Sequence, residues 1–221
     1  MRKRNWAVFL IITLCWLAAG CSSNPYRHYK DNEMIGFVSS IDQQNQTVII
    51  DISEWSKRNL RGSSIPDYGV QYTAKVLPRT IIQNDAGTKL SLADLKTGQK
   101  LQINPPDPKS ETPDELLILP MSKDELYRSA GLLSREKGKY HISVIEESDS
   151  NPDYSLKAFQ AIPGAMAGGI SWLTIDPNHV LNLKQEFSLD TLPVILVFDT
   201  KKLVLKTQKI NDIKEFLEAR A

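Results

Sequence analysis

The chain has 221 residues, of which 27 are basic and 26 acidic, so its net charge is +1. A chain without a basic excess lacks the electrostatic attraction to phosphate backbones that nucleic-acid binding requires. Its hydrophobic content of 41% allows a proper core, and its length suits one large domain or two small ones.

The first 20 residues have the pattern of a secretory signal peptide. Arg2, Lys3 and Arg4 form a basic start, and residues 6–19 are uncharged and largely apolar. This run is too short to cross a membrane, which takes about 20 residues, but it suits the core of a signal peptide. No second apolar run in the sequence approaches membrane-spanning length.

The stretch Ala18-Ala19-Gly20-Cys21 resembles the lipobox of bacterial lipoproteins. The resemblance implies that a diacylglyceryl group with palmitate-type chains is attached to the sulfur of Cys21, and that the chain is cut just before it. Leu17 stands one place earlier than the leucine that the family prefers. The alternative is an ordinary secreted protein with a chance cysteine. We expect a lipoprotein signal peptide over residues 1–20 and a mature chain anchored in the cell membrane, facing outside the cytoplasm.

Processing at this point would change both the charge and the thiol content. It leaves 201 residues with 24 basic and 26 acidic side chains, a balance of −2 that gives the anchor no polybasic support. Of the two cysteines, Cys15 is lost and Cys21 is lipidated. The mature chain would then have no free thiol and no disulfide, which excludes thiol redox chemistry, cysteine nucleophiles and thiolate metal sites. We also expect no cofactor.

After the anchor, residues 21–33 are polar without apolar periodicity, which predicts a lipidated tether. Twelve extended residues from Ser22 would span roughly 40 Å. Residues 34–120 predict an OB-like small β-barrel domain of five or six short strands with one helical turn. The predicted strands cover residues 35–38, 47–52, 71–76, 80–83, 100–103 and 116–119, and the helical turn covers residues 91–95.

Two further features bear on this first domain. Residues 90–103, with the sequence LSLADLKTGQKLQI, resemble the small barrel domains found in Gram-positive lipoproteins. Trp55, Tyr68 and Tyr72 flank a predicted polar loop and are candidates for a binding surface on the barrel, because OB-like barrels bind ligands there. Packing in the core and at the rim is the alternative for these aromatic residues.

Residues 121–221 alternate between helical and strand patterns in the order αβαβαββα. Ser122 and Glu125 have the spacing of a capping box at the start of the first helix. Helices are predicted over residues 122–133, 153–162, 179–187 and 212–219, the last capped by Asn211, and strands over residues 140–145, 170–176, 194–198 and 203–207.

This order resembles the thioredoxin fold. The best match is residues 187–193, which contain Leu192-Pro193, followed by the apolar strand at residues 194–198. In the family a helix ends here, a short loop reaches a cis-proline and a central strand follows, so the resemblance implies a cis Pro193. The family's Cys-x-x-Cys has no counterpart, because residues 148–154 contain no cysteine. We expect a thioredoxin-like domain without its redox role, since fold alone does not carry function.

The same resemblance implies a candidate binding loop. The cis-proline loop of the family presents a backbone edge to an extended peptide, which here gathers Leu192 and Pro193 with Asp149, Asn151 and Tyr154. A structural turn leading into the strand is the alternative. The acidic residues near Asp149 lack the glycine turn and the terminal bidentate acid of a calcium loop, so we expect no metal site.

Residues elsewhere give no sign of catalytic machinery. His28, His141 and His179 are scattered without paired ligand spacing, the serines show no Gly-x-Ser-x-Gly, and the glycines of residues 163–169 lack the spacing of a phosphate-binding loop. Two functions remain. The first is a non-catalytic binding or assembly protein at the cell envelope, whose partners are the membrane and an envelope protein or peptide. The alternative is an enzyme of thioredoxin-like descent using non-thiol chemistry, which the missing thiols and scattered histidines disfavour.

Overall fold

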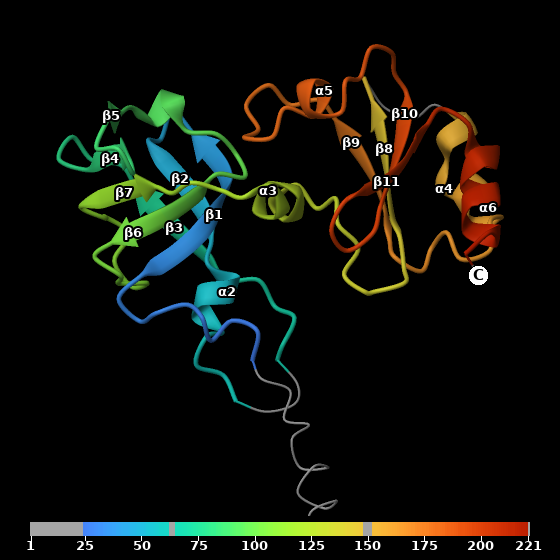
Figure 1. Ribbon diagram of the computed structural model, residues 1–221. Helices are drawn as coiled ribbons and strands as arrows, with labels where there is room; N and C mark the ends of the chain where they lie inside the picture. Colours follow the sequence, from blue (N-terminus) through green and yellow to red (C-terminus); the bar gives the residue numbers. More distant parts are fainter. Residues whose placement is uncertain (1–23, 62–64, 148–151, 221) are drawn as a thin grey trace, which may run out of the picture.

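The computed structural model describes residues 24–61, 65–147 and 152–220, so Cys21, Asp149 and Asn151 lie outside the described residues. The described chain is a mixed α+β protein with two sheets and few helices. Residues 34–118 contribute the seven-stranded first sheet and residues 141–207 the four-stranded second sheet, with α3 between them (Figure 1). No helix in the described ranges is long and apolar enough to cross a membrane.

The strands of the first sheet lie in the order β3-β2-β1-β6-β7-β4-β5. The β4–β7 pair is parallel and the other pairs are antiparallel. The strands are β1 (Met34–Asp42), β2 (Thr47–Asp51), β3 (Gln71–Lys75), β4 (Ile81–Asn84), β5 (Lys89–Leu90), β6 (Lys100–Asn104) and β7 (Glu115–Ile118), and the short helices are α2 (Ser53–Ser56) and the 3-10 turn η1 (Leu92–Asp94).

Strand pairing does not close this sheet into the predicted barrel, because β3 and β5 are left as edges. The chain nevertheless brings its two ends toward each other. β3 and β4 follow one another in sequence, separated only by residues 76–80. The backbone N–H of Lys75, at the end of β3, donates a 2.6 Å hydrogen bond to the carbonyl of Glu111, which leads toward β7. The sheet is therefore curled, with β3 held beside the segment that precedes β7.

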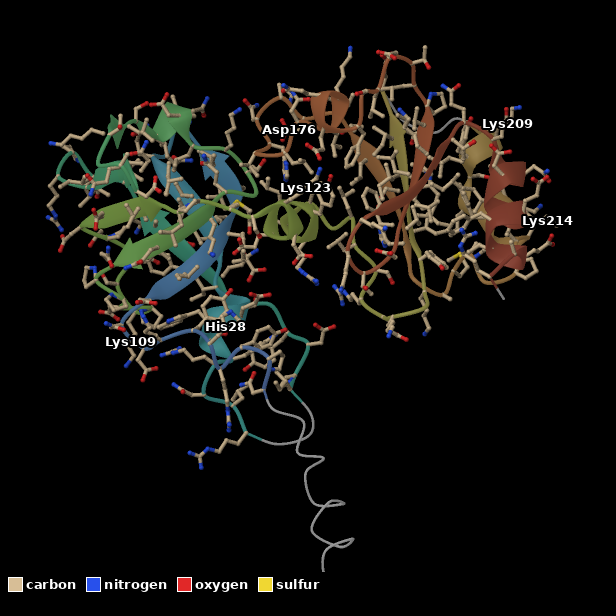
Figure 2. The ribbon with its side chains drawn as sticks, in the orientation of Figure 1. His28, Lys109, Lys123, Asp176, Lys209 and Lys214 are labelled. Carbon is tan, nitrogen blue, oxygen red and sulfur yellow. The ribbon has the colours of Figure 1, made fainter. Side chains whose placement is uncertain are left out.

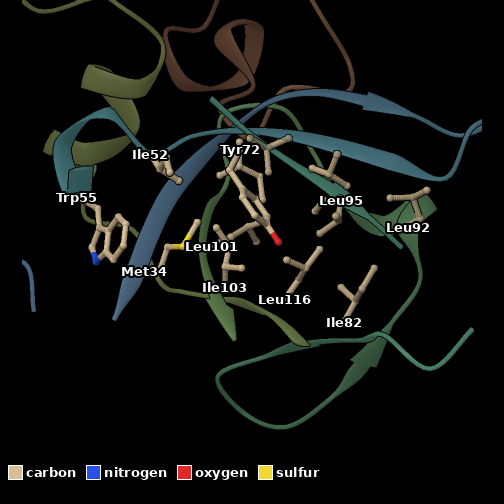
Figure 3. Close-up of a cluster of buried hydrophobic side chains, with 14 residues drawn as sticks. Met34, Ile52, Trp55, Tyr72, Ile82, Leu92, Leu95, Leu101, Ile103 and Leu116 are labelled. Atoms are coloured by element: carbon tan, nitrogen blue, oxygen red, sulfur yellow. The ribbon is translucent and has the colours of Figure 1, made fainter. Parts of the chain in front are cut away.

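The core of the first sheet follows from the period-2 alternation of its strands. In β2 and β6 every second side chain is buried on the same face. Two of the aromatic residues predicted as binding candidates belong to this core: Trp55 is 5% exposed and Tyr72 is 4% exposed (Figure 3). Only Tyr68 is at the surface, at 52% exposed. The binding interpretation is therefore wrong for Trp55 and Tyr72, which pack inside.

The second sheet has the strand order β11-β10-β8-β9, with β8 and β9 parallel and the other pairs antiparallel. Its elements follow the predicted order αβαβαββα. They are α3 (Lys123–Ser129), β8 (His141–Glu146), the 3-10 turn η2 (Pro152–Tyr154), α4 (Leu156–Gln160), β9 (Ile170–Thr174), α5 (Leu183–Glu186), β10 (Val194–Phe198), β11 (Leu203–Thr207) and α6 (Ile210–Glu218).

The second sheet is covered on both faces. Val144 and Ile195 pack with Phe159 of α4 and Phe216 of α6 on one face, where the two helices lie side by side (Figure 1). The opposite face packs against Tyr127 of α3 and the segment around α5. All five residues of β10 are buried, as a central strand with two covered faces requires.

Several predicted helices are too long. The helix expected over residues 179–187 is only α5, which begins after Asn182, whose side-chain oxygen accepts a 3.0 Å hydrogen bond from the N–H of Gln185. Residues 178–180 are instead held by backbone hydrogen bonds to Thr97 of the first sheet's segment. The helix predicted over residues 153–162 is divided into η2 and α4, α3 ends at Ser129 before Gly131 at φ 68°, and α6 begins at Ile210, so that Asn211 lies inside the helix.

The two sheets are joined by specific polar contacts. The N–H of Val180 donates to the carbonyl of Thr97 at 2.8 Å, and the N–H of Thr97 donates to the carbonyl of Asn178 at 3.0 Å. Lys100 of β6 forms a 2.5 Å ion pair with Glu125 of α3. The two sheets are thus joined by hydrogen bonds and an ion pair as well as by the chain that connects them.

The described part of the predicted tether, residues 24–33, packs against the folded chain. Asn24 is only 7% exposed, and its side-chain amide donates hydrogen bonds to the carbonyls of Lys57, Arg58 and Leu60. Trp55 donates its indole N–H to the carbonyl of Lys30 at 2.9 Å. The extended tether is wrong over these residues, because they pack on α2 and the loop after it.

Candidate functional site

The sequence-predicted site lies at the end of the second sheet where β8 ends and β10 begins. Val194, the first residue of β10, is in register with Ile145 of β8. The antiparallel register therefore places Leu192 and Pro193 at the same end as Glu146, the last residue of β8. The Leu192–Pro193 peptide bond is cis, as the resemblance implies. Asp149 and Asn151 fall outside the described residues.

Tyr154 spans this end of the sheet from one edge to the other. Its hydroxyl donates a 2.6 Å hydrogen bond to the carbonyl of Gln208, just after the edge strand β11. Its carbonyl accepts a 2.9 Å hydrogen bond from the indole N–H of Trp172, in the opposite edge strand β9. The side chain of Gln208 in turn donates to the hydroxyl of Thr191 at 2.8 Å. These bonds tie Tyr154 to the loop that carries Leu192 and Pro193.

A buried carboxylate lies beside the same loop. Glu146 is 8% exposed, and one of its carboxylate oxygens has no hydrogen-bond partner within the described ranges. Its strand neighbour in the register is Thr174 of β9. A buried polar atom without a hydrogen-bond partner costs free energy, so this oxygen calls for an explanation beyond packing. Glu146 could not be identified from the sequence, since a single acid at a strand end has no distinctive spacing.

The segment from α4 to β9 contains three exposed hydrophobic side chains. Leu156 is 45% exposed, Met166 45% and Trp172 37%. β9 is also an edge strand, with one side of its backbone unpaired to any described strand. Of the three side chains, Trp172 belongs to this edge strand. An exposed apolar side chain on an unpaired strand edge is typical of surfaces that receive an extended peptide. Trp172 reads in the sequence as an ordinary strand residue, so this feature could be found only from the structure.

His141, at the start of β8, contacts the connection that precedes β9. Its ring nitrogens lie 3.2 Å from the carbonyl oxygen of Gly168 and 3.0 Å from the hydroxyl of Ser171. Burial lowers the pKa of His141, an effect that the carbonyl of Gly168 opposes and the charge of Arg135 reinforces. The imidazole is therefore held neutral between a carbonyl and a hydroxyl, without the carboxylate that completes a catalytic triad.

A cleft of about 720 Å³ lies between the region of α2 and the start of the second sheet. It is lined from both sides, by Tyr26, Glu54 and Asp67 of the first part of the chain and by Arg128 and His141 of the second. The lining carries both signs of charge and also includes the apolar side chains of Leu133 and Ile170. Over the described ranges, no three His, Cys, Asp or Glu side chains lie close enough together to hold a metal ion.

The remaining histidines have separate structural surroundings. His28 is exposed and stacks against Tyr29 with ring centroids 4.2 Å apart. His179 packs against Gly98, where a Cβ atom would lie 2.6 Å from its ring nitrogen. The three histidines are thus dispersed through the fold.

Comparison with known proteins adds little to this geometry. The sequence matches no protein-family model, and no relative is found among curated proteins. Among solved structures, one similar chain is the thioredoxin of Malassezia sympodialis (Mala s 13), at a TM-score of 0.29 and 10% sequence identity, over 45% of this chain and 85% of the other. A likeness at this level supports no conclusion about function.

Proposed function

We propose that the protein is a membrane-anchored lipoprotein on the outer side of the cytoplasmic membrane, with a non-catalytic binding or assembly role at the cell envelope. The observation that carries the proposal is the sequence of residues 2–21: a basic start, a short apolar run and the stretch Ala18-Ala19-Gly20-Cys21. Only two residues separate Cys21 from Asn24, where the described fold begins. Acyl chains on Cys21 would supply the membrane affinity, at about 0.8 kcal/mol per buried CH₂, and two chains make such binding stable.

For the first sheet we propose an OB-like barrel with an interrupted third strand. If β3 and β4 are taken as two halves of one strand, the neighbours β1–β2, β2–β3, β4–β7, β7–β6 and β6–β1 form a circle. Residues 76–80 join the halves, and the Lys75–Glu111 backbone bond lies where they part. This arrangement supports a barrel closed by the chain itself where strand pairing is missing.

For residues 121–221 we propose a thioredoxin-like domain without redox chemistry. The support is the element order, the strand order β9-β8-β10-β11 with only β8 and β9 parallel, and the place of Pro193 immediately before β10. The two cysteines of the sequence are Cys15 and Cys21, so no thiol lies in this region. Thiol–disulfide exchange requires an attacking thiolate.

The binding role is proposed for the β9 edge and the adjoining loop. Trp172 exposes apolar surface on this edge, and Leu156 is exposed two residues after Tyr154. Tyr154 links the edge to the loop of Leu192 and Pro193. An extended peptide of an envelope protein is the partner that such an edge fits, through backbone hydrogen bonds and contacts with the exposed side chains. One observation favours the alternative of a non-thiol enzyme: Glu146 is a buried acid with one carboxylate oxygen that has no partner within the described ranges.

Membrane fractionation of producing cells tests the proposed lipid anchor. The wild-type protein should sediment with membranes and require detergent for release, whereas Cys21→Ala should remain as uncleaved precursor or appear as soluble protein. Recovery of Cys21→Ala as a mature-sized protein that still requires detergent would contradict the proposal. Ser22→Ala, which alters the neighbouring position without removing the thiol, is the matched control.

Cross-linking in intact cells tests the proposed binding of a partner at the β9 edge. A photo-reactive group at Leu156 should form a specific adduct with an envelope protein, and this adduct should be lost with Trp172→Ser. The same group at Lys214, on α6, is the control position. Equal adducts from both positions, or none from Leu156, would remove the support for a partner at the β9 edge.

A further inference from the structure

Residues 24–33 are fixed to α2 and the loop that follows it, and the two segments form one surface, which we call the anchor face (residues 24–33 and 53–61). Asn24 is bonded to the carbonyls of Lys57, Arg58 and Leu60 at 2.7, 3.2 and 3.1 Å. Arg58 adds a 2.7 Å ion pair to Asp31. The position of Asn24 on the fold is therefore well defined.

Chain length sets how far this face can lie from the lipid. Three peptide units join Cys21 to Asn24, and three residues span at most about 11 Å. This limit holds whatever conformation those residues adopt. A tether reaching to residue 33 would have left the fold free to turn on the membrane, whereas a link this short keeps one part of the surface near the lipid headgroups.

The charge of the anchor face differs from that of the remaining chain. It contains five basic and three acidic residues, although the mature chain as a whole has a balance of −2. Asp31 and Glu33 are engaged in ion pairs with Arg58 and Lys30 on the face itself. Arg27 and Arg61 are exposed. Basic side chains close to an anionic bilayer are each attracted by about 1 kcal/mol.

We propose that the anchor face lies against the lipid bilayer, with Arg27 and Arg61 directed to anionic phospholipid headgroups, so that the protein has a fixed orientation on the membrane. This inference rests on lipid attachment at Cys21. His28 lies on the anchor face beside α2, whereas Lys214 lies on α6 across the second sheet (Figure 2). In this orientation α6 lies beyond the second sheet, far from the anchor face (Figure 2).

Fluorescence quenching on vesicles tests the orientation. Full-length protein is purified from producing cells in its lipidated form, carrying either His28→Cys or Lys214→Cys with a fluorophore on the new thiol. Both positions are exposed, and circular dichroism checks that each labelled variant keeps the fold. The protein is reconstituted into vesicles of phosphatidylcholine and phosphatidylglycerol in which part of the lipid carries a quencher on its headgroup.

The label at position 28 should lose most of its fluorescence, and the label at position 214 should keep it. Adding Arg27→Gln and Arg61→Gln to the His28→Cys protein should restore part of the fluorescence on anionic vesicles, but not change it on vesicles of phosphatidylcholine alone. Equal quenching at both positions, or stronger quenching at position 214, would overturn the orientation while leaving the anchor intact. A protein whose mass shows no lipid on Cys21 would overturn the anchoring proposal and this inference with it.

Discussion

The backbone of Gly168 lies against the carbonyl group of Tyr140, so closely that a Cβ atom on Gly168 would be 2.1 Å from the carbonyl oxygen. This contact brings the connection before β9 onto the start of β8 and places the carbonyl of Gly168 beside the ring of His141. The glycine-containing stretch at residues 163–169 is thus a closely packed connection at this point.

Replacing Gly168 by alanine should destabilise the second sheet. The added methyl group must displace the backbone of Tyr140, and overpacking of this kind costs about 1–3 kcal/mol. Urea unfolding followed by circular dichroism measures the loss. Gly69→Ala is the matched control, because the nearest atom to its Cβ would be the hydroxyl of Ser53 at 3.9 Å and its φ is not positive. Equal stability of the two variants would contradict the close contact.

The stability of the protein should fall as the pH drops below the ordinary pKa of histidine, about 6.5. Burial lowers the pKa of His141 in the folded state, so the unfolded chain takes up a proton before the folded chain does. The contribution of neutral His141 is therefore complete above this pH and is lost as the pH falls through the lowered folded pKa. Urea midpoints at about pH 7.5 and about pH 5.5 should differ less in His141→Gln than in the wild type. An unchanged difference would exclude His141 as the source.

Asn24 should contribute to stability although it lies at the beginning of the described chain. Asn24→Ala removes three hydrogen bonds to backbone carbonyls, and unsatisfied buried groups cost about 1–3 kcal/mol. Hydrogen exchange should also show faster opening of residues 25–33. Asn32→Ala is the control, since Asn32 is exposed. Retention of wild-type protection in Asn24→Ala would mean that the anchor face does not depend on this side chain.

The alternation of buried and exposed residues made most of the strands predictable. β2, β3 and β6 lie within a residue of the expected boundaries, because one-sided burial imposes a period of two. β5 was missed, since its two residues are too few to show a pattern. The cap at Ser122 is confirmed: its hydroxyl accepts a hydrogen bond from the N–H of Glu125.

Contacts between residues far apart in sequence account for what could not be predicted. Asn24 bonds to a carbonyl 33 positions away, so nothing in the local sequence distinguishes residues 24–33 from a free tether. The pairing of Thr97 with residues 178–180 likewise prevents the helix that the local pattern favours. In the candidate site, Pro193 and Tyr154 could be predicted from the resemblance to the thioredoxin fold. The burial of Glu146 and the exposure of Trp172 could not, because both depend on tertiary packing.

A chain that begins at Ser22, without Cys21 and the proposed signal peptide, should be inactive in thiol–disulfide exchange. It contains no cysteine, and the reaction needs a thiolate. In an insulin-reduction assay it should give the rate of the buffer alone, while thioredoxin assayed in parallel gives a clear rate. Measurable turnover by protein freed of contaminating oxidoreductases would contradict the proposed redox-inactive domain.

The mass of the N-terminal peptide, measured on protein purified from the membrane fraction, decides whether the chain is lipid-anchored. We expect a mature protein that begins at Cys21 and carries a diacylglyceryl group on its sulfur, with residues 1–20 absent. An unmodified Cys21, or a chain that retains residues before it, would contradict the membrane anchor.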